Sequence, residues 1–317
     1  MPTTDISADL RYSTGSRAPT TSPVSRQAIF LEGHCNMGRK PDFLIIGAMK
    51  SGTTSLWDDL CLNEQFFRSP EKEPNILIKY DNKDEIIRQY SSLFKRADQS
   101  QICGEASTWY TKLPHFDGVP QRAHDSIGDN LKLVMIMRDP VKRLYSHIQH
   151  HLVMDYVKPE DCDRVIFEDE RYIAFSEYDR QLQPWIDIFG LSNLHCISLV
   201  DFRKDRHETL RKLYDFLDIR NHDQIKINTT VSNSGNELRS NHKSSWRKFL
   251  KSRFYTRVVR PNTPEFLRSS IRDRLMPIRE VPDWTFSEET RNYIKGRLSG
   301  VQERLQHLIH HDIVINE

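Results

Sequence analysis

Short apolar runs alternate with segments of helical periodicity along this chain. Mainly apolar runs lie at residues 43–46, 131–137 and 194–199. Runs of this length, bounded by glycine or polar residues, are typical of strands buried on both faces of a parallel sheet. Between the runs, apolar residues recur at the spacing of a helix, as in residues 84–94. The alternation predicts an α/β fold, a three-layer αβα domain with a mostly parallel central sheet.

The same pattern gives approximate bounds for each element. Strands are expected at residues 42–46, 66–69, 102–103, 131–137 and 194–199. Helices are expected at residues 53–63, 84–94, 120–127, 140–154, 177–189 and 207–217, with a last long helix that ends near residue 309. Ser287 is the expected N-cap of this last helix, because a serine side chain accepts a hydrogen bond from the first turn.

The domain organisation follows from where this pattern begins. Residues 1–29 are rich in Ser, Thr, Pro and Arg and show no periodicity, which predicts a disordered tail. Residues 30–40 are expected to form a short lead-in. Residues 41–317 are then expected to form a single domain, which is a normal size for one large α/β unit.

Composition and charge narrow the class of protein. The 317 residues hold 46 Lys and Arg against 44 Asp and Glu, so the net charge is only +2. This balance does not favour a nucleic-acid or anionic-membrane partner, and a basic site would have to be local. No apolar run is long enough to span a membrane, and residues 1–10 lack a signal pattern. The five cysteines are scattered without metal-ligand spacing, so we expect reduced thiols, no metal and a cytoplasmic location.

A polar turn follows the first apolar run. Gly47 ends that run, residues 50–54 read Lys-Ser-Gly-Thr-Thr, and a helix is expected from Thr53. The N–H groups at a helix start and the positive end of its dipole favour an anion, and Lys50 adds a full charge. The order differs from a Walker A loop, in which the lysine follows the second glycine. The turn therefore predicts a phosphate site, with an ordinary turn and a solvated lysine as the alternative.

A second motif follows the run at residues 131–137. It reads Arg138-Asp-Pro, with a further arginine at Arg143 and a serine at Ser146. In this order, the two motifs resemble those of the sulfotransferases that use 3′-phosphoadenosine 5′-phosphosulfate (PAPS). The resemblance implies a P-loop-like sulfotransferase fold and PAPS as co-substrate. It covers residues 41 to about 310 and is strongest at these two motifs.

The resemblance also implies which residues hold the nucleotide. The expected ligands of the 5′-phosphosulfate are Lys50, Ser51, Gly52, Thr53 and Thr54, and those of the 3′-phosphate are Arg138, Ser146 and, from a late loop, Arg239. Lys50 is also expected to offset the negative charge on the leaving group. Arg138 could instead pair with Asp139 or Glu105, and Arg143 could be a third phosphate ligand or part of a solvated helix face.

The acceptor side is implied by two further segments. Residues 70–74, Pro-Glu-Lys-Glu-Pro, resemble the Lys-Glu-Pro element of glycan-type and bacterial sulfotransferases, which implies Glu73 as the catalytic base with Lys72 beside it. The alternative is a charged exposed turn. His115 is the second candidate base, since the small-molecule branch of the family uses a histidine. No metal is required, because a transferring sulfuryl group carries less charge than a phosphoryl group.

Residues 104–110 resemble a family segment that usually reads Glu-x-[Ser/Thr]-Pro-x-Tyr. Thr108 stands in place of the usual proline, and Ala106 stands where some glycan-type relatives carry a lysine. Glu105 and Ser107 are therefore expected either to line the acceptor cleft or to make buried structural hydrogen bonds.

These observations predict a sulfotransferase that moves a sulfuryl group from PAPS to an acceptor hydroxyl, on a carbohydrate or glycolipid. A small-molecule phenol or alcohol sulfotransferase is the alternative within the family. Outside the family, a P-loop kinase would need magnesium and a Walker B acid, for which Asp201 is the one weak candidate. A non-catalytic nucleotide-binding protein is the third alternative, and the oligomeric state stays open.

Overall fold

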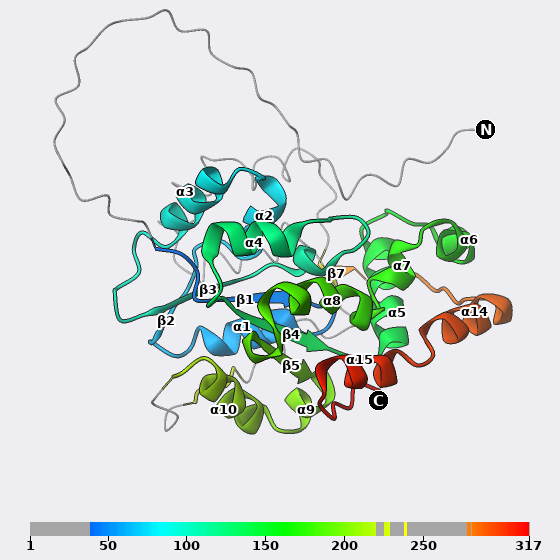
Figure 1. Cartoon of the computed structure of the whole chain (residues 1–317). Coiled ribbons are helices and arrows are strands. Elements are labelled where there is room, and N and C mark those ends of the chain that lie inside the picture. Colours follow the sequence, from blue (N-terminus) through cyan, green and yellow to red (C-terminus); the bar gives the residue numbers. More distant parts are fainter. Residues whose placement is uncertain (1–38, 220–224, 229–237, 240–277, 280, 317) are drawn as a thin grey trace, which may run out of the picture. The chain divides into compact units, whose positions relative to one another are not determined.

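Five strands form the central sheet of the protein. The structure, a computed structural model, describes residues 39–219, 225–228, 238–239, 278–279 and 281–316. The strands of the sheet are β1 (Phe43–Gly47), β2 (Phe66–Phe67), β3 (Ile102–Ala106), β4 (Lys132–Met137) and β5 (Leu194–Ser198). Every pairing between them is parallel, in the order β2-β3-β1-β4-β5. The predicted parallel sheet is thus confirmed (Figure 1).

The strand β1 lies at the centre, between β3 and β4. Because all five strands run the same way, their carboxyl ends meet at one edge of the sheet. The chain first builds the β3 side and then crosses to the β4 side of β1. In an open α/β sheet, ligands bind outside the carboxyl ends of the strands at such a change of direction.

Helices fill the connections between strands. The longer ones are α1 (Thr53–Leu60), α3 (Lys83–Leu93), α4 (Val119–Ile127), α5 (Pro140–Val153), α8 (Tyr178–Phe189), α10 (Arg206–Phe216), α14 (Glu288–Leu298) and α15 (Val301–Ile309). The shorter ones are α2 (Ile76–Lys79), η2 (Thr108–Thr111), η3 (Pro159–Asp161), α6 (Cys162–Glu168), α7 (Arg171–Ala174), η4 (Leu191–Asn193) and α9 (Leu199–Lys204). The short helices were not expected from the periodicity, because one or two turns are too brief to show a period.

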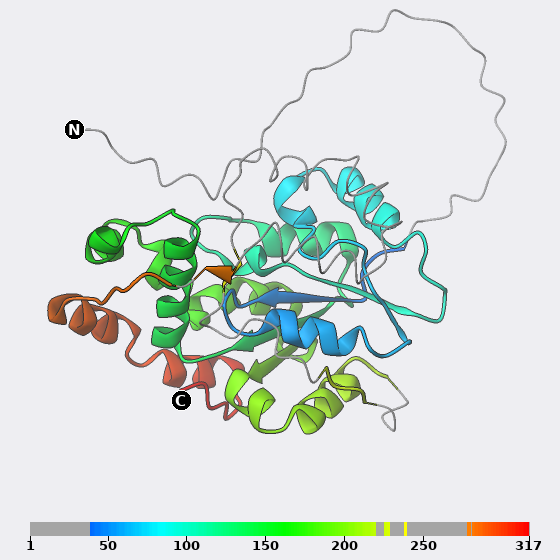
Figure 2. The same cartoon turned by 180° about the vertical axis from the view of Figure 1, so that it is seen from behind.

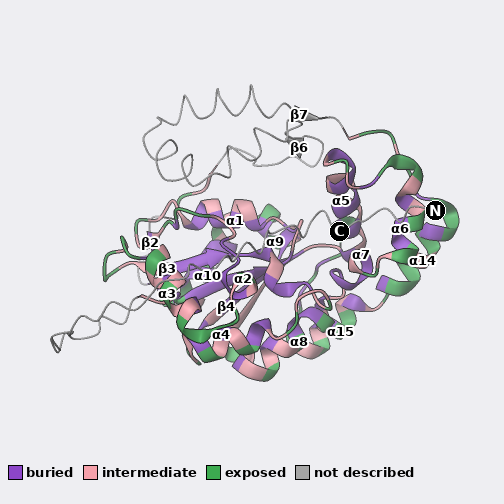
Figure 3. Ribbon diagram, turned by 90° about the horizontal axis from the view of Figure 1, so that it is seen from above, coloured by how far each residue is buried: buried purple, intermediate pink, exposed green. Residues whose placement is uncertain are grey.

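The sheet is covered on both faces, which makes the three predicted layers. The helices α1 and α10 pack on one face, where Phe43, Ile45 and Val134 meet Trp57 and Leu213 in one apolar cluster. The helices α4 and α8 lie on the other face, as the two opposite views show (Figures 1 and 2). Residues 43–46 are fully buried, which explains why this strand reads as an unbroken apolar run. The central part of the sheet is coloured as buried in Figure 3.

The expected last helix is broken into two. Ser299 has an extended backbone (ψ 143°) and Gly300 has a φ of 72°, so α14 ends and α15 begins there. The prediction of one long helix was wrong, because the left-handed backbone of Gly300 ends the first helix within an apolar pattern that continues through it. The cap itself is confirmed, since the Ser287 side chain accepts a hydrogen bond from the N–H of Thr290 at 3.1 Å.

A small antiparallel pair completes the described elements. It consists of β6 (Leu238–Arg239) and β7 (Ile278–Arg279), and β6 contacts α5. The predicted tail at residues 1–29 lies outside the described residues, and the expected domain boundary at residue 41 stays a prediction. In the part of the chain that the structure describes, no helix is both long and apolar enough to cross a membrane.

Candidate active site

The turn after β1 is shaped by residues with a left-handed backbone. Lys50 has a φ of 67° and Gly52 a φ of 92°. A Cβ added to Gly52 would lie 2.8 Å from Cδ1 of Leu199, so this side chain would have to shift. The turn leads directly into α1 at Thr53, whose first N–H groups have no partner within the helix. This is the arrangement expected of an anion site.

The turn after β4 lies against it. The register pairs Gly47 with Met135, so Lys50 and Arg138 each follow three residues beyond a paired position. Arg138 Nη1 donates to the carbonyl oxygen of Lys50 at 3.4 Å, and the hydroxyl of Tyr178 donates to the Arg138 carbonyl at 2.8 Å. The structure thus brings the two predicted phosphate motifs together at one edge of the sheet.

The alternative partners of Arg138 are engaged elsewhere. The Asp139 carboxylate accepts a hydrogen bond from the N–H of Lys142 at 2.7 Å and so caps α5. Glu105 accepts hydrogen bonds from Ser107, Tyr110 and Tyr90. The alternative in which Arg138 pairs with one of these acids stays a prediction.

A third cation stands behind these two. Arg143 is fully buried, and it donates from Nε to Ser176 Oγ at 2.6 Å and from Nη2 to the Tyr172 carbonyl at 2.7 Å. The expectation that it lies on a solvated helix face was therefore wrong. Burial, followed by the charges of Arg138 and Arg143, lowers the pKa of Lys50 from 10.5 to about 8. Three crowded cations favour the binding of an anion at this edge.

Two further predicted nucleotide ligands lie around this cluster. Ser146 is half-buried on α5, the helix that follows Arg138. Arg239 lies on β6, which contacts α5. Their phosphate contacts stay predictions.

The segment that carries Glu73 is joined to the first turn. Lys72 Nζ donates a hydrogen bond to Thr54 Oγ1, and both residues are half-buried. Burial lowers the pKa of Lys72, although the nearby charges of Glu73 and Asp58 oppose that shift. Glu71 is exposed, whereas Lys72 and Glu73 are half-buried. The alternative of a charged exposed turn therefore does not describe residues 72 and 73.

The backbone of Glu73 is held at the end of β3. Its φ is 54°, its N–H donates to the Ala106 carbonyl at 3.1 Å, and its carboxylate accepts from Thr108 Oγ1 at 3.4 Å. A left-handed backbone at a residue other than glycine carries strain and persists only where the surroundings fix it. Lys50 and Glu73 share this property.

Glu105 and Ser107 are both fully buried. Glu105 accepts hydrogen bonds from Ser107 Oγ at 2.6 Å, Tyr110 OH at 2.5 Å and Tyr90 OH at 3.2 Å. Burial raises the pKa of Glu105 from 4.5 to about 7, although these three hydrogen bonds oppose the shift. These positions favour the second expectation, buried structural hydrogen bonding, and contact with an acceptor stays a prediction.

His115 lies in the segment after η2. Its ring meets the ring of Phe116 edge-on at 4.7 Å, and Phe116 in turn lies against Trp109 at 5.3 Å. Its role as the second candidate base stays a prediction. Asp201, the weak Walker B candidate, is exposed on α9.

A protein-family model matches the part of the chain that forms this site. The model of the sulfotransferase domain matches residues 40–258, well over half of the chain. The chain belongs to the sulfotransferase-domain family. The predicted family is therefore confirmed, and the alternative of a P-loop kinase is excluded at the family level.

Curated relatives of this sulfotransferase-domain protein agree with that assignment. The bifunctional heparan sulfate N-deacetylase/N-sulfotransferase 1 of Caenorhabditis briggsae is 24% identical over 222 residues, covering 63% of this chain and 25% of that protein. The membrane-associated sulfotransferase kil1 of Dictyostelium discoideum is 30% identical over 119 residues, covering 37% of this chain and 24% of that protein. The chain thus spans about a quarter of the length of these relatives.

A solved structure supports the fold of this sulfotransferase-domain protein. A sulfotransferase from Alicyclobacillus acidocaldarius has a TM-score of 0.59 and 19% sequence identity, over 87% of this chain and 98% of that chain. At this identity the likeness concerns the fold alone. It confirms the predicted sulfotransferase fold.

Several buried polar residues of the sulfotransferase site were not predicted. Tyr90 and Tyr110 bond Glu105, and Tyr178 bonds Arg138. Lys112 is only 4% exposed, with its Nζ 4.1 Å from the centroid of the Trp109 ring. The sequence offered one signal, since Tyr110 ends a family-like segment. The other residues lie on helical or irregular stretches where an aromatic or lysine reads as ordinary core or surface.

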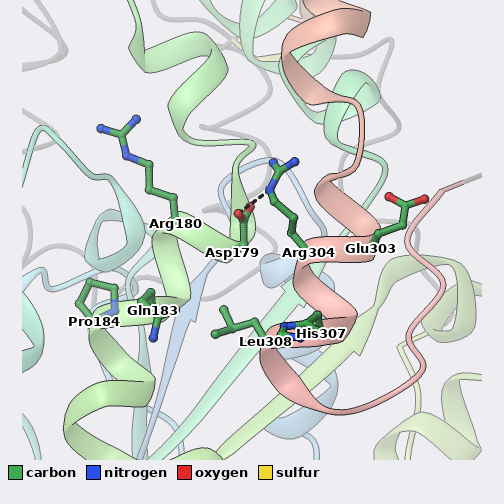
Figure 4. Close-up of a pocket in the computed structure, with 8 residues that line it drawn as sticks. All are labelled: Asp179, Arg180, Gln183, Pro184, Glu303, Arg304, His307 and Leu308. Carbon is green, nitrogen blue, oxygen red and sulfur yellow. Dashed lines mark hydrogen bonds and ion pairs between the residues drawn. The ribbon is translucent and has the colours of Figure 1, made fainter.

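Two surface hollows lie away from this edge. One of about 680 Å³ lies between α8 and α15, where Arg304 Nε donates to Asp179 Oδ2 at 2.8 Å (Figure 4). Another of about 600 Å³ lies near the amino ends of β1 and β4. Neither includes a predicted site residue, and the second is at the wrong edge for a ligand of a parallel sheet. Among the described residues, no group of His, Cys, Asp or Glu is arranged to hold a metal.

Proposed function

We propose that this protein transfers the sulfuryl group of PAPS to an acceptor group on a carbohydrate. One observation carries the proposal: the turns that hold Lys50 and Arg138 meet at the carboxyl edge of the sheet, and Lys72, beside Glu73, bonds Thr54 in the first of them. Membership of the sulfotransferase-domain family supports the same reaction.

The residues at this edge suit a nucleotide with an anionic group at each end. Lys50 and the start of α1 would hold the 5′-phosphosulfate, and Arg138 with Ser146 would hold the 3′-phosphate. Burial and the repulsion of neighbouring cations lower the pKa of Lys50, and a bound anion would stabilise its charged form. When bound, PAPS supplies an activated sulfuryl group on a phosphate leaving group.

The chain's own groups would then act on the acceptor. Glu73 would take the proton from the attacking acceptor group while Thr108 keeps a hydrogen bond to its carboxylate. Lys50 would present fixed positive charge where negative charge develops on the leaving oxygen. Because Lys50, Arg138 and Arg143 already supply charge here, we infer that the transfer needs no metal.

The carbohydrate acceptor is supported by the relatives, whose names give heparan sulfate as the glycan. We infer a sugar hydroxyl as the acceptor, as the Lys-Glu-Pro element implies. A sugar amine is the second candidate, because those relatives are named as N-sulfotransferases. A cytoplasmic location and the absence of a nucleic-acid partner remain parts of the proposal.

Radiolabelled PAPS tests this function directly. The protein is incubated with N-acetylated heparan chains, with the same chains carrying free amines, and with p-nitrophenol. Transfer to both polysaccharides supports a hydroxyl acceptor, and transfer only to free-amine chains supports an amine. Transfer to the phenol alone would replace the carbohydrate with a small molecule.

Nucleotide binding gives a second test that needs no acceptor. Adenosine 3′,5′-bisphosphate should raise the melting temperature, whereas ADP should not. Arg138 and Ser146 would bind the 3′-phosphate, which ADP lacks. Equal stabilisation by both nucleotides, or transfer to none of the acceptors, would overturn the proposal.

A further inference from the structure

The loop that carries the candidate base is held by the segment directly after β3. Two backbone N–H groups at the end of this loop, from the N-cap and the first turn of α2, donate to hydroxyl oxygens: Asn75 N to Ser107 Oγ at 3.1 Å, and Leu77 N to Tyr110 OH at 3.4 Å. The N–H of Glu73 itself donates to the Ala106 carbonyl at 3.1 Å. The position of Glu73 therefore depends on two buried hydroxyl groups.

Both of these hydroxyls also bond one buried carboxylate. Ser107 Oγ donates to Glu105 Oε2 at 2.6 Å, and Tyr110 OH donates to Glu105 Oε1 at 2.5 Å. Tyr90 on α3 donates to the same Oε1 at 3.2 Å. Glu105 is fully buried, and these three hydrogen bonds join it to Ser107, Tyr110 and Tyr90, outside the loop.

We propose that Glu105 is a positioning residue for the candidate base, because its carboxylate fixes the direction of the two hydroxyls that hold the Glu73 loop. This inference rests on the proposed function, in which Glu73 accepts the acceptor proton.

The argument depends on the single hydrogen of each hydroxyl group. When Glu105 is ionised it can only accept, so Ser107 and Tyr110 both point their hydrogens at it. Their lone pairs then face the N–H groups of Asn75 and Leu77. When Glu105 is protonated it must donate, and a hydroxyl that accepts this proton has to send its own hydrogen elsewhere. Where the accepting hydroxyl is that of Ser107 or Tyr110, and not that of Tyr90, its link to the loop is weakened.

Both forms of Glu105 occur near neutral pH. Burial raises its pKa to about 7, and the negative charge of Glu73 adds to the shift. The other titratable groups that face it are Tyr90 from α3 and Tyr110 from η2, and the pKa of each is raised far above neutral by burial. Glu105 is thus the group of this network whose raised pKa places its change of charge near neutral pH.

Steady-state kinetics on the full chain test the proposal, with radiolabelled PAPS and whichever heparan acceptor the wild type uses. Glu105→Gln and Ser107→Ala should each lower kcat by roughly 10- to 100-fold, because a small misplacement of a reacting group has this effect. The KM for PAPS should stay within about twofold, since the side-chain hydrogen bonds of Glu105 and Ser107 go to Tyr90, Tyr110 and Asn75 and to no residue of the two nucleotide turns. Ser91→Ala, which removes a half-buried hydroxyl of α3, is the matched control and should leave kcat unchanged.

The pH profile separates positioning from simple loss of stability. In the wild type, kcat should fall on the acid side with a midpoint near 7, and Glu105→Gln should remove this part of the profile. A lower kcat with an unaltered acid limb would mean that Glu105 only stabilises the fold. A kcat within about twofold of wild type in both variants would overturn the proposal.

Hydrogen exchange at the amides of Asn75 and Leu77 gives a readout without catalysis. Both amides should exchange faster in Glu105→Gln and in Ser107→Ala, while the amides of β4 keep their protection. If Glu105→Gln does not fold, Ser107→Ala carries the test alone. If the wild type transfers no sulfuryl group but this exchange contrast holds, the proposed function fails, while the role of Glu105 in holding the loop is kept. Unchanged exchange at both amides would overturn the proposed role of Glu105 in holding the loop.

Discussion

The two sides of β1 differ in the pKa shifts of their buried groups. On the β4 side, Lys50, Arg138 and Arg143 crowd together, and burial with mutual repulsion lowers the pKa of Lys50 to about 8. On the β3 side, Glu73 and Glu105 come together, and burial raises the pKa of Glu105 to about 7. One side thus suits an anion and the other suits a proton acceptor.

This contrast shows how a parallel sheet can divide a transfer reaction. The strand β1 lies between β3 and β4. The anion site adjoins the end of β4, and the candidate base adjoins the end of β3. The β4 side is built from two turns, whereas the β3 side is built from a loop held by buried hydroxyls. Changes on the first side should therefore affect nucleotide binding, and changes on the second side should affect turnover.

The largest effect is expected from Glu73→Gln. Loss of a general base should lower kcat by roughly 10²- to 10⁴-fold while the affinity for adenosine 3′,5′-bisphosphate is kept. Glu71→Gln is the matched control, because Glu71 lies two residues away and is exposed. Transfer assays and calorimetric titration measure the two quantities. Retention of kcat in Glu73→Gln, together with its loss in His115→Ala, would move the base to His115.

Stability should fall as pH rises past the ordinary range of a carboxyl group. An unfolded Glu105 loses its proton near 4.5, whereas burial keeps the proton on the folded chain up to about pH 7. The folded state therefore binds more protons across this window, and its stability decreases with pH there by up to about 3 kcal/mol. Urea unfolding at pH 5 and pH 7.5 should show a smaller difference in Glu105→Gln than in wild type. An equal difference in both proteins would show that Glu105 does not titrate in this way.

Arg138→Ala should weaken nucleotide binding. A lost hydrogen bond to a charged group is worth about 1.5–3 kcal/mol, which corresponds to roughly a 10- to 100-fold weaker affinity for adenosine 3′,5′-bisphosphate. Lys142→Ala removes an exposed cation of α5 and is the control for charge alone. Calorimetry on both variants measures the contrast, and similar losses in the two would assign the effect to general electrostatics.

The smallest effect concerns pH and the nucleotide. A protonated Lys50 attracts the anion, and this proton is lost from the free protein as pH rises through about 8. Affinity for adenosine 3′,5′-bisphosphate should therefore be constant below this pH and fall by up to about tenfold per pH unit above it. Lys50→Arg should remove the fall, since arginine stays charged. An affinity that does not change between pH 7 and 9.5 in the wild type would exclude Lys50 as a ligand.

Much of the fold could be predicted from the sequence. The strands β1 and β4 are buried on both faces, so their apolar runs are long enough to recognise. The strand β3 was expected only at residues 102–103, because Gly104 and Glu105 do not look like strand residues, yet the structure extends it to Ala106. Gly104 is needed there because an added Cβ would lie 2.2 Å from the ring of Phe43. Such a close approach between strands leaves no trace in a local pattern.

The site was predictable only where it follows a motif. Lys50 and Arg138 come directly after strands, so their meeting follows from the parallel sheet. The hydroxyl network around Glu105 does not, because Tyr90 lies on an apolar helical stripe and looks like ordinary core. The left-handed backbone of Glu73 is also invisible in the sequence, since it is imposed by tertiary contacts and not by a glycine.

The hydrogen bond between Lys72 and Thr54 has a consequence for how variants of this protein are interpreted. It connects a residue beside the candidate base to a residue of the nucleotide turn. The acceptor side and the nucleotide side of the site are therefore joined by one hydrogen bond. Substitutions at these two positions should therefore not be additive in their effect on kcat/KM. The difference between the double variant and the sum of the single variants measures the coupling between the nucleotide turn and the acceptor side.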